Sequence, residues 1–236
     1  MSWGSTIRHR IGSLKWPSHC LLCGAPGKPG LDLCAGCLAD LPRNACCCAR
    51  CALPLAQPAA LCGRCLTHAP PWQAAWVPFR YGWPLDRLET RYKFSAHLAA
   101  GRTLAALWRE RPPPELPQAI VPVPLHRIRL RQRGYDQTLE LARRIARQMH
   151  LPLLDDCLKR QRATRAQSTL DAVARRRNVR GAFGIRHGAA LPDHVALFDD
   201  VLTTGATLGE CARVLHRAGV ARVDVWALAR VAAPGQ

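Results

Sequence analysis

Residues 195–207, VALFDDVLTTGAT, decide the fold of this 236-residue chain. Their first four residues are apolar, as in a strand buried inside a parallel sheet. An amphipathic run over residues 207–218 then predicts a helix, which Gly219 ends. A strand, a turn and a helix in this order place the turn at the carboxyl edge of a parallel sheet, where open α/β folds bind ligands. The stretch therefore predicts an α/β fold with a ligand site in this turn.

Two kinds of ligand-binding group follow one another in this stretch. Asp199 and Asp200 can accept hydrogen bonds from a vicinal diol, such as the 2′ and 3′ hydroxyls of ribose. The turn and the start of the helix offer backbone amides, hydroxyls and a positive dipole end to a phosphate. The residues expected to do so are Thr203, Thr204, Gly205, Ala206 and Thr207. Together they predict a ribose 5-phosphate group as ligand; the alternative is an ordinary strand, turn and helix cap that binds nothing.

Over all its positions the stretch resembles the signature with which type I phosphoribosyltransferases bind phosphoribosyl diphosphate (PRPP). Regulators that only sense PRPP have a similar loop, so the resemblance implies binding more strongly than catalysis. In that fold, the loop after the first core strand holds the diphosphate. The matching run here is VPVPLHRIRLRQRGYDQT, residues 121–138, in which arginines and backbone groups can neutralise and bind a diphosphate. The candidates are Pro122, Val123, Pro124, Arg127 and Arg133, with Arg129 and Arg131 beside them; the alternative is a solvated basic loop.

The residues around these loops predict the rest of a parallel sheet flanked by helices. Residues 119–124 and 222–231 are expected to be strands, and residues 76–81 a short strand. One or two helices are expected before the prolines at 112–114. A helix over residues 137–149 is expected to have Asp136 as its N-cap. Its buried stripe is predicted to be Leu139, Ala142, Ile145, Ala146 and Met149.

Ten of the twelve cysteines lie between Cys20 and Cys65, and eight of them form four CxxC pairs. Two such pairs supply the four thiolates of a tetrahedral Zn²⁺ site, and zinc with no open position is structural. The predicted ligands are Cys20, Cys23, Cys34, Cys37, Cys48, Cys51, Cys62 and Cys65. The spacing leaves open sequential pairing, interleaved pairing or a single zinc, and a redox role is a weaker alternative. Cys46 and Cys47 are not expected to be ligands.

The charge and composition of the chain limit the kinds of partner that it can bind. The formal charge is +18, and residues 121–187 hold 16 basic and 5 acidic residues, a net of +11 (16 − 5). Such a segment attracts polyanions, either a nucleotide diphosphate or nucleic acid. No apolar stretch is long enough for a transmembrane helix, and residues 1–20 lack the apolar core of a signal peptide, so a cytoplasmic protein is expected. The expected organisation is a basic leader (1–15), a zinc-binding module (16–70), a connecting segment (71–118) and a PRPP-binding domain (119–236).

The chain as a whole resembles the ComF family, which includes ComFC and GntX-like proteins. The resemblance rests on the cysteine pairs, the YKF element at Lys93, the diphosphate loop, residues 162–183 and the PRPP loop. It implies a zinc finger joined to a phosphoribosyltransferase fold and a role in the uptake or processing of transforming DNA, with DNA-processing proteins as partners. The family usually has asparagine where this chain has Asp136. Residues 162–183 correspond to a flap over the active site, with Arg165, Gln167 and Arg176 as candidates to close on diphosphate; the alternative is a basic surface helix.

Two functions are expected from these features. The first is a Mg²⁺-dependent transfer of ribosyl 5-phosphate from PRPP to an acceptor, with Lys93 or Arg133 assisting electrostatically. The second is a single-stranded nucleic-acid-binding adaptor that keeps the PRPP site as a sensor or relic. An amidophosphoribosyltransferase is disfavoured, because the early cysteines are paired. The acceptor and the oligomeric state stay open.

Overall fold

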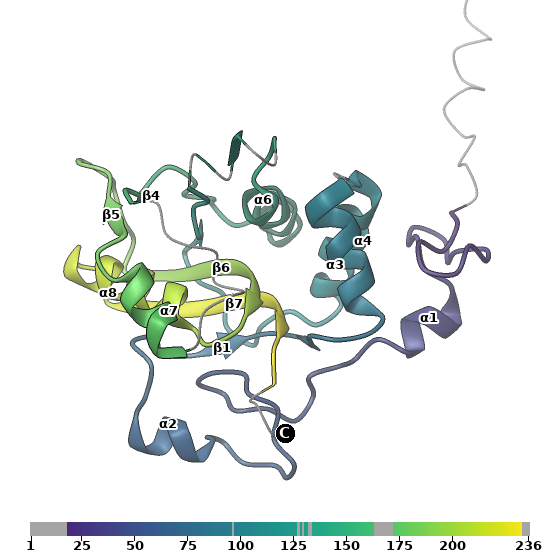
Figure 1. Ribbon diagram of the computed structural model, residues 1–236, viewed down its shortest axis with the longest axis horizontal. Coiled ribbons are helices and arrows are strands. Elements are labelled where there is room, and N and C mark those ends of the chain that lie inside the picture. Colours follow the sequence, from purple (N-terminus) through teal and green to yellow (C-terminus); the bar gives the residue numbers. More distant parts are fainter. Residues whose placement is uncertain are drawn as a thin grey trace, which may run out of the picture.

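The computed structural model describes residues 18–95, 97–126, 128, 130–131, 134–162 and 172–232. Its central sheet is parallel, with strand order β1-β7-β6-β3, and β2 also pairs with β7 (Figure 1). The strands are β1 (Ala75–Trp76), β2 (Phe79–Arg80), β3 (Ala119–Pro122), β6 (His194–Leu202) and β7 (Arg222–Arg230). The expected connecting segment thus contributes β1 and β2 to the same sheet as the PRPP loop. The predicted α/β class is confirmed, with a mainly parallel sheet between helices.

Helices cover both faces of the sheet because neighbouring strand residues point to opposite faces. Ala196 and Phe198 belong to one core with the helices α3 (Leu85–Ser95), α4 (Leu98–Arg109) and α6 (Gln137–Met149). Val195 and Leu197 belong to the other core, with α8 (Ala206–Arg217). Near α8 lie α7 (Ala172–Val179) and the antiparallel pair β4 (Leu158–Arg160) and β5 (Phe183–Ile185). Among the described residues, every helix is too short or too polar to traverse a lipid bilayer.

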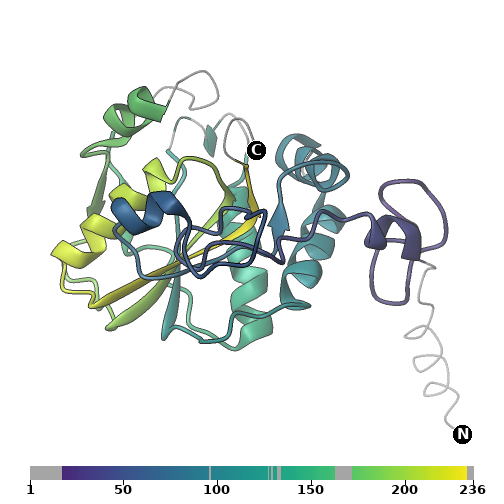
Figure 2. The same cartoon turned by 90° about the horizontal axis from the view of Figure 1, so that it is seen from below.

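The cysteine-rich segment folds as two similar units, whose equivalent cysteines lie 28 residues apart in the chain (48 − 20). The helices α1 (Ala35–Ala39) and α2 (Gly63–Thr67) occupy equivalent places, and each begins directly after a cysteine, Cys34 or Cys62. The bridge His19–Pro26 in the first unit matches Cys47–Pro54 in the second. Figures 1 and 2 place the first unit at one end of the molecule beyond α4, and the second beside β1. We call them ribbon 1 (residues 18–40) and ribbon 2 (residues 46–68).

Several predicted elements appear where the sequence placed them. Helix α6 spans residues 137–149, and Asp136 caps it by accepting a hydrogen bond from the Leu139 amide at 3.0 Å. Its buried face differs in part, because Leu141 is buried whereas Leu139 and Met149 are half-buried. Strand β6 is longer than the four apolar residues suggested, since its pairing with β7 continues to Leu202. Asp199 and Asp200 therefore lie within the strand rather than after it.

Candidate functional site

A buried ion-pair cluster lies near the carboxyl end of β6. The Nζ of Lys93, from α3, lies 3.1 Å from Asp200 Oδ2 and 3.1 Å from Glu89 Oε2. Burial opposes the charge of Asp200, but the Lys93 ammonium outweighs it and lowers the pKa of Asp200 below its ordinary value. Burial raises the pKa of Glu89 to about 7, with the nearby Lys93 acting in the opposite direction. The cluster therefore holds Asp200 as a carboxylate whose second oxygen accepts the Val201 amide at 2.7 Å.

Asp199 differs from its neighbour in electrostatics and surroundings. Successive strand residues point to opposite faces, so Asp199 lies on the α8 side, where its charge also affects the pKa of Cys211. Burial and the charge of Asp200 raise the pKa of Asp199 well above its ordinary value. The pKa values of the two neighbouring carboxyl groups thus shift in opposite directions, so Asp199 holds its proton more readily than Asp200. Such a pair can donate one hydrogen bond to a ligand and accept others from it.

The predicted phosphate-binding turn, residues 203–207, follows β6 and includes the first two residues of α8. Gly205 has φ +74°, a left-handed conformation that ordinary residues rarely adopt. A Cβ atom there would lie 2.7 Å from Cη2 of the buried Trp72. Gly205 is therefore required by backbone conformation and by close packing, in addition to the approach of a ligand expected from the sequence. The Thr204 hydroxyl accepts a hydrogen bond from the Ala206 amide at 3.4 Å, and α8 begins at Ala206.

The buried Arg230, at the end of β7, ties this turn to ribbon 2. Its Nη1 donates to the carbonyls of Leu202 at 3.1 Å, Thr203 at 2.7 Å and also Val231, and its Nε donates to the Cys51 carbonyl at 2.9 Å. Trp72 adds a second connection, because its Nε1 donates to the Arg50 carbonyl at 2.7 Å while its ring contacts Gly205. Ribbon 2 therefore supports the turn from behind.

The loop after β3 is anchored to the same corner. Asp136 Oδ2 accepts the Leu125 amide at 3.1 Å while its other oxygen caps α6, so one carboxylate sets both the loop and the helix. Val123 continues the sheet by donating its amide to Phe198 at 2.9 Å. Tyr92, next to Lys93, donates its hydroxyl to the Gln137 carbonyl at 3.0 Å. The candidates Arg127, Arg133, Arg165 and Gln167 lie outside the described residues, as does the side chain of Arg176.

Each ribbon brings four thiols together, so the cysteine pairing is sequential. In each unit the four sulfur atoms lie within 4.8 Å of one another, and the sets are Cys20, Cys23, Cys34, Cys37 and Cys48, Cys51, Cys62, Cys65. Burial acts to raise the pKa of Cys20 and Cys48, but backbone amides outweigh it and lower the values to about 6 and about 7. Four thiols at this distance, one of them readily ionised, are consistent with structural Zn²⁺ in each ribbon.

Some residues of this site were not predicted from the sequence. Glu89, Trp72 and Arg230 reach it from distant parts of the chain. The local signal was at Arg230, because this arginine ends a mostly apolar strand, VDVWALAR, in which the one other charged residue is Asp224. Buried charged residues of this kind are rare and need partners.

Comparisons with known proteins agree with this architecture. The double zinc ribbon domain family matches residues 12–66. Competence protein F of Haemophilus influenzae is 37% identical over 174 residues, which cover 70% of this chain and 76% of the relative. DNA utilization protein YhgH of Escherichia coli K12 is 35% identical over 175 residues, 70% of this chain and 75% of the relative. Competence protein ComFC of Streptococcus pneumoniae is 28% identical over 152 residues, 64% and 66% of the two chains.

Proposed function

Because this chain belongs to the ComF family of competence and DNA utilisation proteins, we propose that it binds PRPP and transfers its ribosyl 5-phosphate within DNA uptake or DNA utilisation. The names of the relatives support the DNA-related role. The PRPP chemistry rests on the strand end of β6. A cytoplasmic location is part of the proposal, since PRPP is an intracellular metabolite.

The observation that carries the proposal is the order of groups along β6 and α8. Asp200, held ionised by Lys93 at 3.1 Å, lies three residues before a turn that opens a helix of 12 residues. The carboxylate accepts hydrogen bonds from the hydroxyls of a ribose, and the backbone amides of the turn and the dipole of α8 bind the 5-phosphate. Asp199 is next to it in the strand, and its raised pKa favours the protonated form, which can donate a hydrogen bond. Diol and phosphate sites in this order suit PRPP.

The proposed reaction breaks the bond between C1 of the ribose and the diphosphate. The acceptor forms a new bond to C1 as the diphosphate leaves with the electron pair of the broken bond. The arginines of the loop after β3 would bind the leaving diphosphate, and Mg²⁺ bound together with the substrate would supply further positive charge to it. Lys93 acts through Asp200, because the ion pair fixes the carboxylate that positions the ribose. No protein nucleophile is needed for this chemistry.

The second candidate function is binding of single-stranded nucleic acid. It is favoured by residues 121–187, which carry a net charge of +11 (16 basic − 5 acidic residues). A basic cleft carries part of this charge on the α7 and α8 side. It is lined by Arg177, Arg180, Arg213 and Arg217. The two functions are compatible when the acceptor itself is DNA.

One assay separates the two functions. Diphosphate release from PRPP and Mg²⁺ is measured with a panel of bases, nucleotides and single-stranded DNA as acceptors. Transfer predicts release that depends on one acceptor and is lost in Lys93→Met. A chain that binds single-stranded DNA with a steep salt dependence, and releases no diphosphate with any acceptor, would be an adaptor instead.

A further inference from the structure

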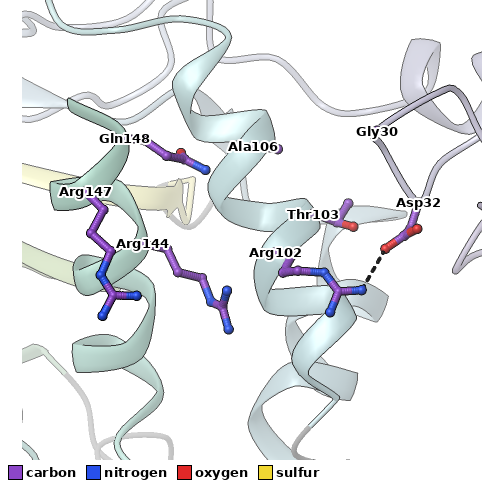
Figure 3. Close-up of a pocket in the computed structure, with 8 residues that line it drawn as sticks. All are labelled: Gly30, Asp32, Arg102, Thr103, Ala106, Arg144, Arg147 and Gln148. Atoms are coloured by element: carbon purple, nitrogen blue, oxygen red, sulfur yellow. Dashed lines mark ion pairs between the residues drawn. The ribbon is translucent and has the colours of Figure 1, made fainter. Parts of the chain in front are cut away.

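A second polar site, apart from the PRPP turn, lies between α4, α6 and ribbon 1. It is a hollow of about 350 Å³, within the ~300–1,000 Å³ typical of small-molecule sites. In Figure 3, Arg144, Arg147 and Gln148 project from α6, and Arg102 and Thr103 from α4. Ribbon 1 adds Gly30 and Asp32, and the Arg102 guanidinium lies 3.5 Å from the Asp32 carboxylate. Arg144 is eight residues beyond the cap of α6, about 12 Å along the helix axis, so this hollow is separate from the β6 strand end.

Three polar atoms at this hollow are buried and lack a hydrogen-bond partner. They are Thr103 Oγ1, Arg144 Nε and Gln148 Oε1. Thr103 is only 2% exposed. Proteins rarely bury unpaired polar atoms, so three of them on residues that line one hollow favour a ligand that pairs with them. Ala106 also lines the hollow, and its small side chain leaves the space between the helices open.

The charges and hydrogen-bonding groups of the residues that line the hollow indicate which class of ligand it fits. Three arginines and one aspartate give a net charge of +2 (3 − 1), which matches a phosphate monoester of charge about −1.5 to −2 near neutral pH. Gln148 Oε1 is an acceptor, so the ligand must carry a donor beside its phosphate, such as a hydroxyl. The described residues that line the hollow include no aromatic side chain, so nothing there stacks on a base.

We propose that this hollow, the α4–α6 site, binds a phosphate monoester with a neighbouring hydroxyl group. Arg102, Arg144 and Arg147 contact the phosphate, and Thr103 and Gln148 contact the hydroxyl. Two sources share this chemistry, a free sugar phosphate and the 5′-phosphorylated end of a DNA strand. The site does not depend on PRPP binding by β6.

The test is a calorimetric titration with ribose 5-phosphate and with a thymidine oligonucleotide that does or does not carry a 5′-phosphate. The background is Asp199→Asn/Asp200→Asn, which weakens binding of a ribose phosphate at β6. Binding of the sugar phosphate identifies a small metabolite, and binding that requires the 5′-phosphate of the oligonucleotide identifies a strand end; either supports the site. The affinity for either ligand should fall about tenfold or more in Arg144→Met, and binding should be lost in Ala106→Leu, because the leucine side chain fills the hollow. Arg109→Met, the same charge change on an exposed part of α4, should bind as the parent does.

Thr103→Val separates a binding role from a structural one. It removes the unpaired hydroxyl at nearly constant shape, so the ligand-free protein should melt at the same or a higher temperature while the phosphate binds more weakly. The proposal is overturned if neither ligand binds, if Ala106→Leu binds as tightly as the parent, or if Thr103→Val lowers the melting temperature and leaves binding unchanged.

Discussion

Replacing Gly205 with alanine tests how the phosphate-binding turn is held. An alanine at φ +74° costs about 1–2 kcal/mol of backbone strain. Its Cβ would also lie 2.7 Å from Cη2 of Trp72, which is 3% exposed and cannot move freely because its Nε1 is bonded to Arg50. Forcing this buried ring aside costs about 1–3 kcal/mol more, which is the usual cost of overpacking a protein core. We therefore expect Gly205→Ala to lower the free energy of unfolding by about 2–5 kcal/mol.

The measurement is urea unfolding of the zinc-loaded protein, with two matched glycines as controls. Gly188 has φ +70° and open space around its Cβ position, so Gly188→Ala reports the strain alone. Gly36, in α1 with open space and no positive φ, reports a replacement without either cost. If Gly205→Ala is no more destabilising than Gly188→Ala, the contact with Trp72 does not constrain the turn and this reasoning is wrong.

Three other predictions follow from the same contacts. Glu89→Gln should remove a pH dependence of stability, because the Glu89 carboxyl keeps its proton up to about pH 7 in the folded protein and loses it near 4.5 in the unfolded chain. The free energy of unfolding of the wild type should therefore fall by on the order of 3 kcal/mol as the pH rises between these values. Urea unfolding at about pH 5 and about pH 8 should show a smaller loss of stability in the variant. Cys48→Ser should weaken PRPP binding as well as stability, because ribbon 2 contacts the turn, whereas Cys20→Ser in ribbon 1 should lower stability alone. The two variants are compared by calorimetric titration with PRPP after their zinc content has been measured. An equal loss of PRPP affinity in both would contradict the account. Arg230→Met should destabilise the fold by about 3 kcal/mol or more, because it removes the guanidinium that donates to the carbonyls of Cys51, Leu202 and Thr203. A change in thermal unfolding within error would refute that assignment.

The elements with strong local signals could be predicted from the sequence. Helix α6 has an N-cap at Asp136 and a clear apolar period, and α8 follows a turn that contains Gly205. The end of β6 was placed too early, because Asp199 and Asp200 interrupt the apolar run. Pairing with β7 continues through them, and this tertiary contact is not visible in the local pattern.

Contacts between residues far apart in the chain limited how much of the site could be predicted from the sequence. Asp199 and Asp200 were predicted to bind the ribose and Lys93 to assist electrostatically, but the ion pair between Lys93 and Asp200 could not be predicted without the fold. Arg230 donates to Thr203 and Cys51, which are 27 and 179 residues away in the chain. The cysteine pairing was open for a similar reason, since equal CxxC spacings fit either arrangement until the backbone of each ribbon is known.

The most direct test of PRPP binding is a calorimetric titration of the full chain with PRPP and Mg²⁺. Asp199→Asn/Asp200→Asn is compared with Asp155→Asn/Asp156→Asn, an exposed acidic pair before β4 that undergoes the same charge change. We predict saturable binding to the wild type and to the control pair, and loss of binding in the β6 pair. An absence of binding to the wild type, or equal binding to both variants, would contradict the assignment of this strand end as the PRPP site.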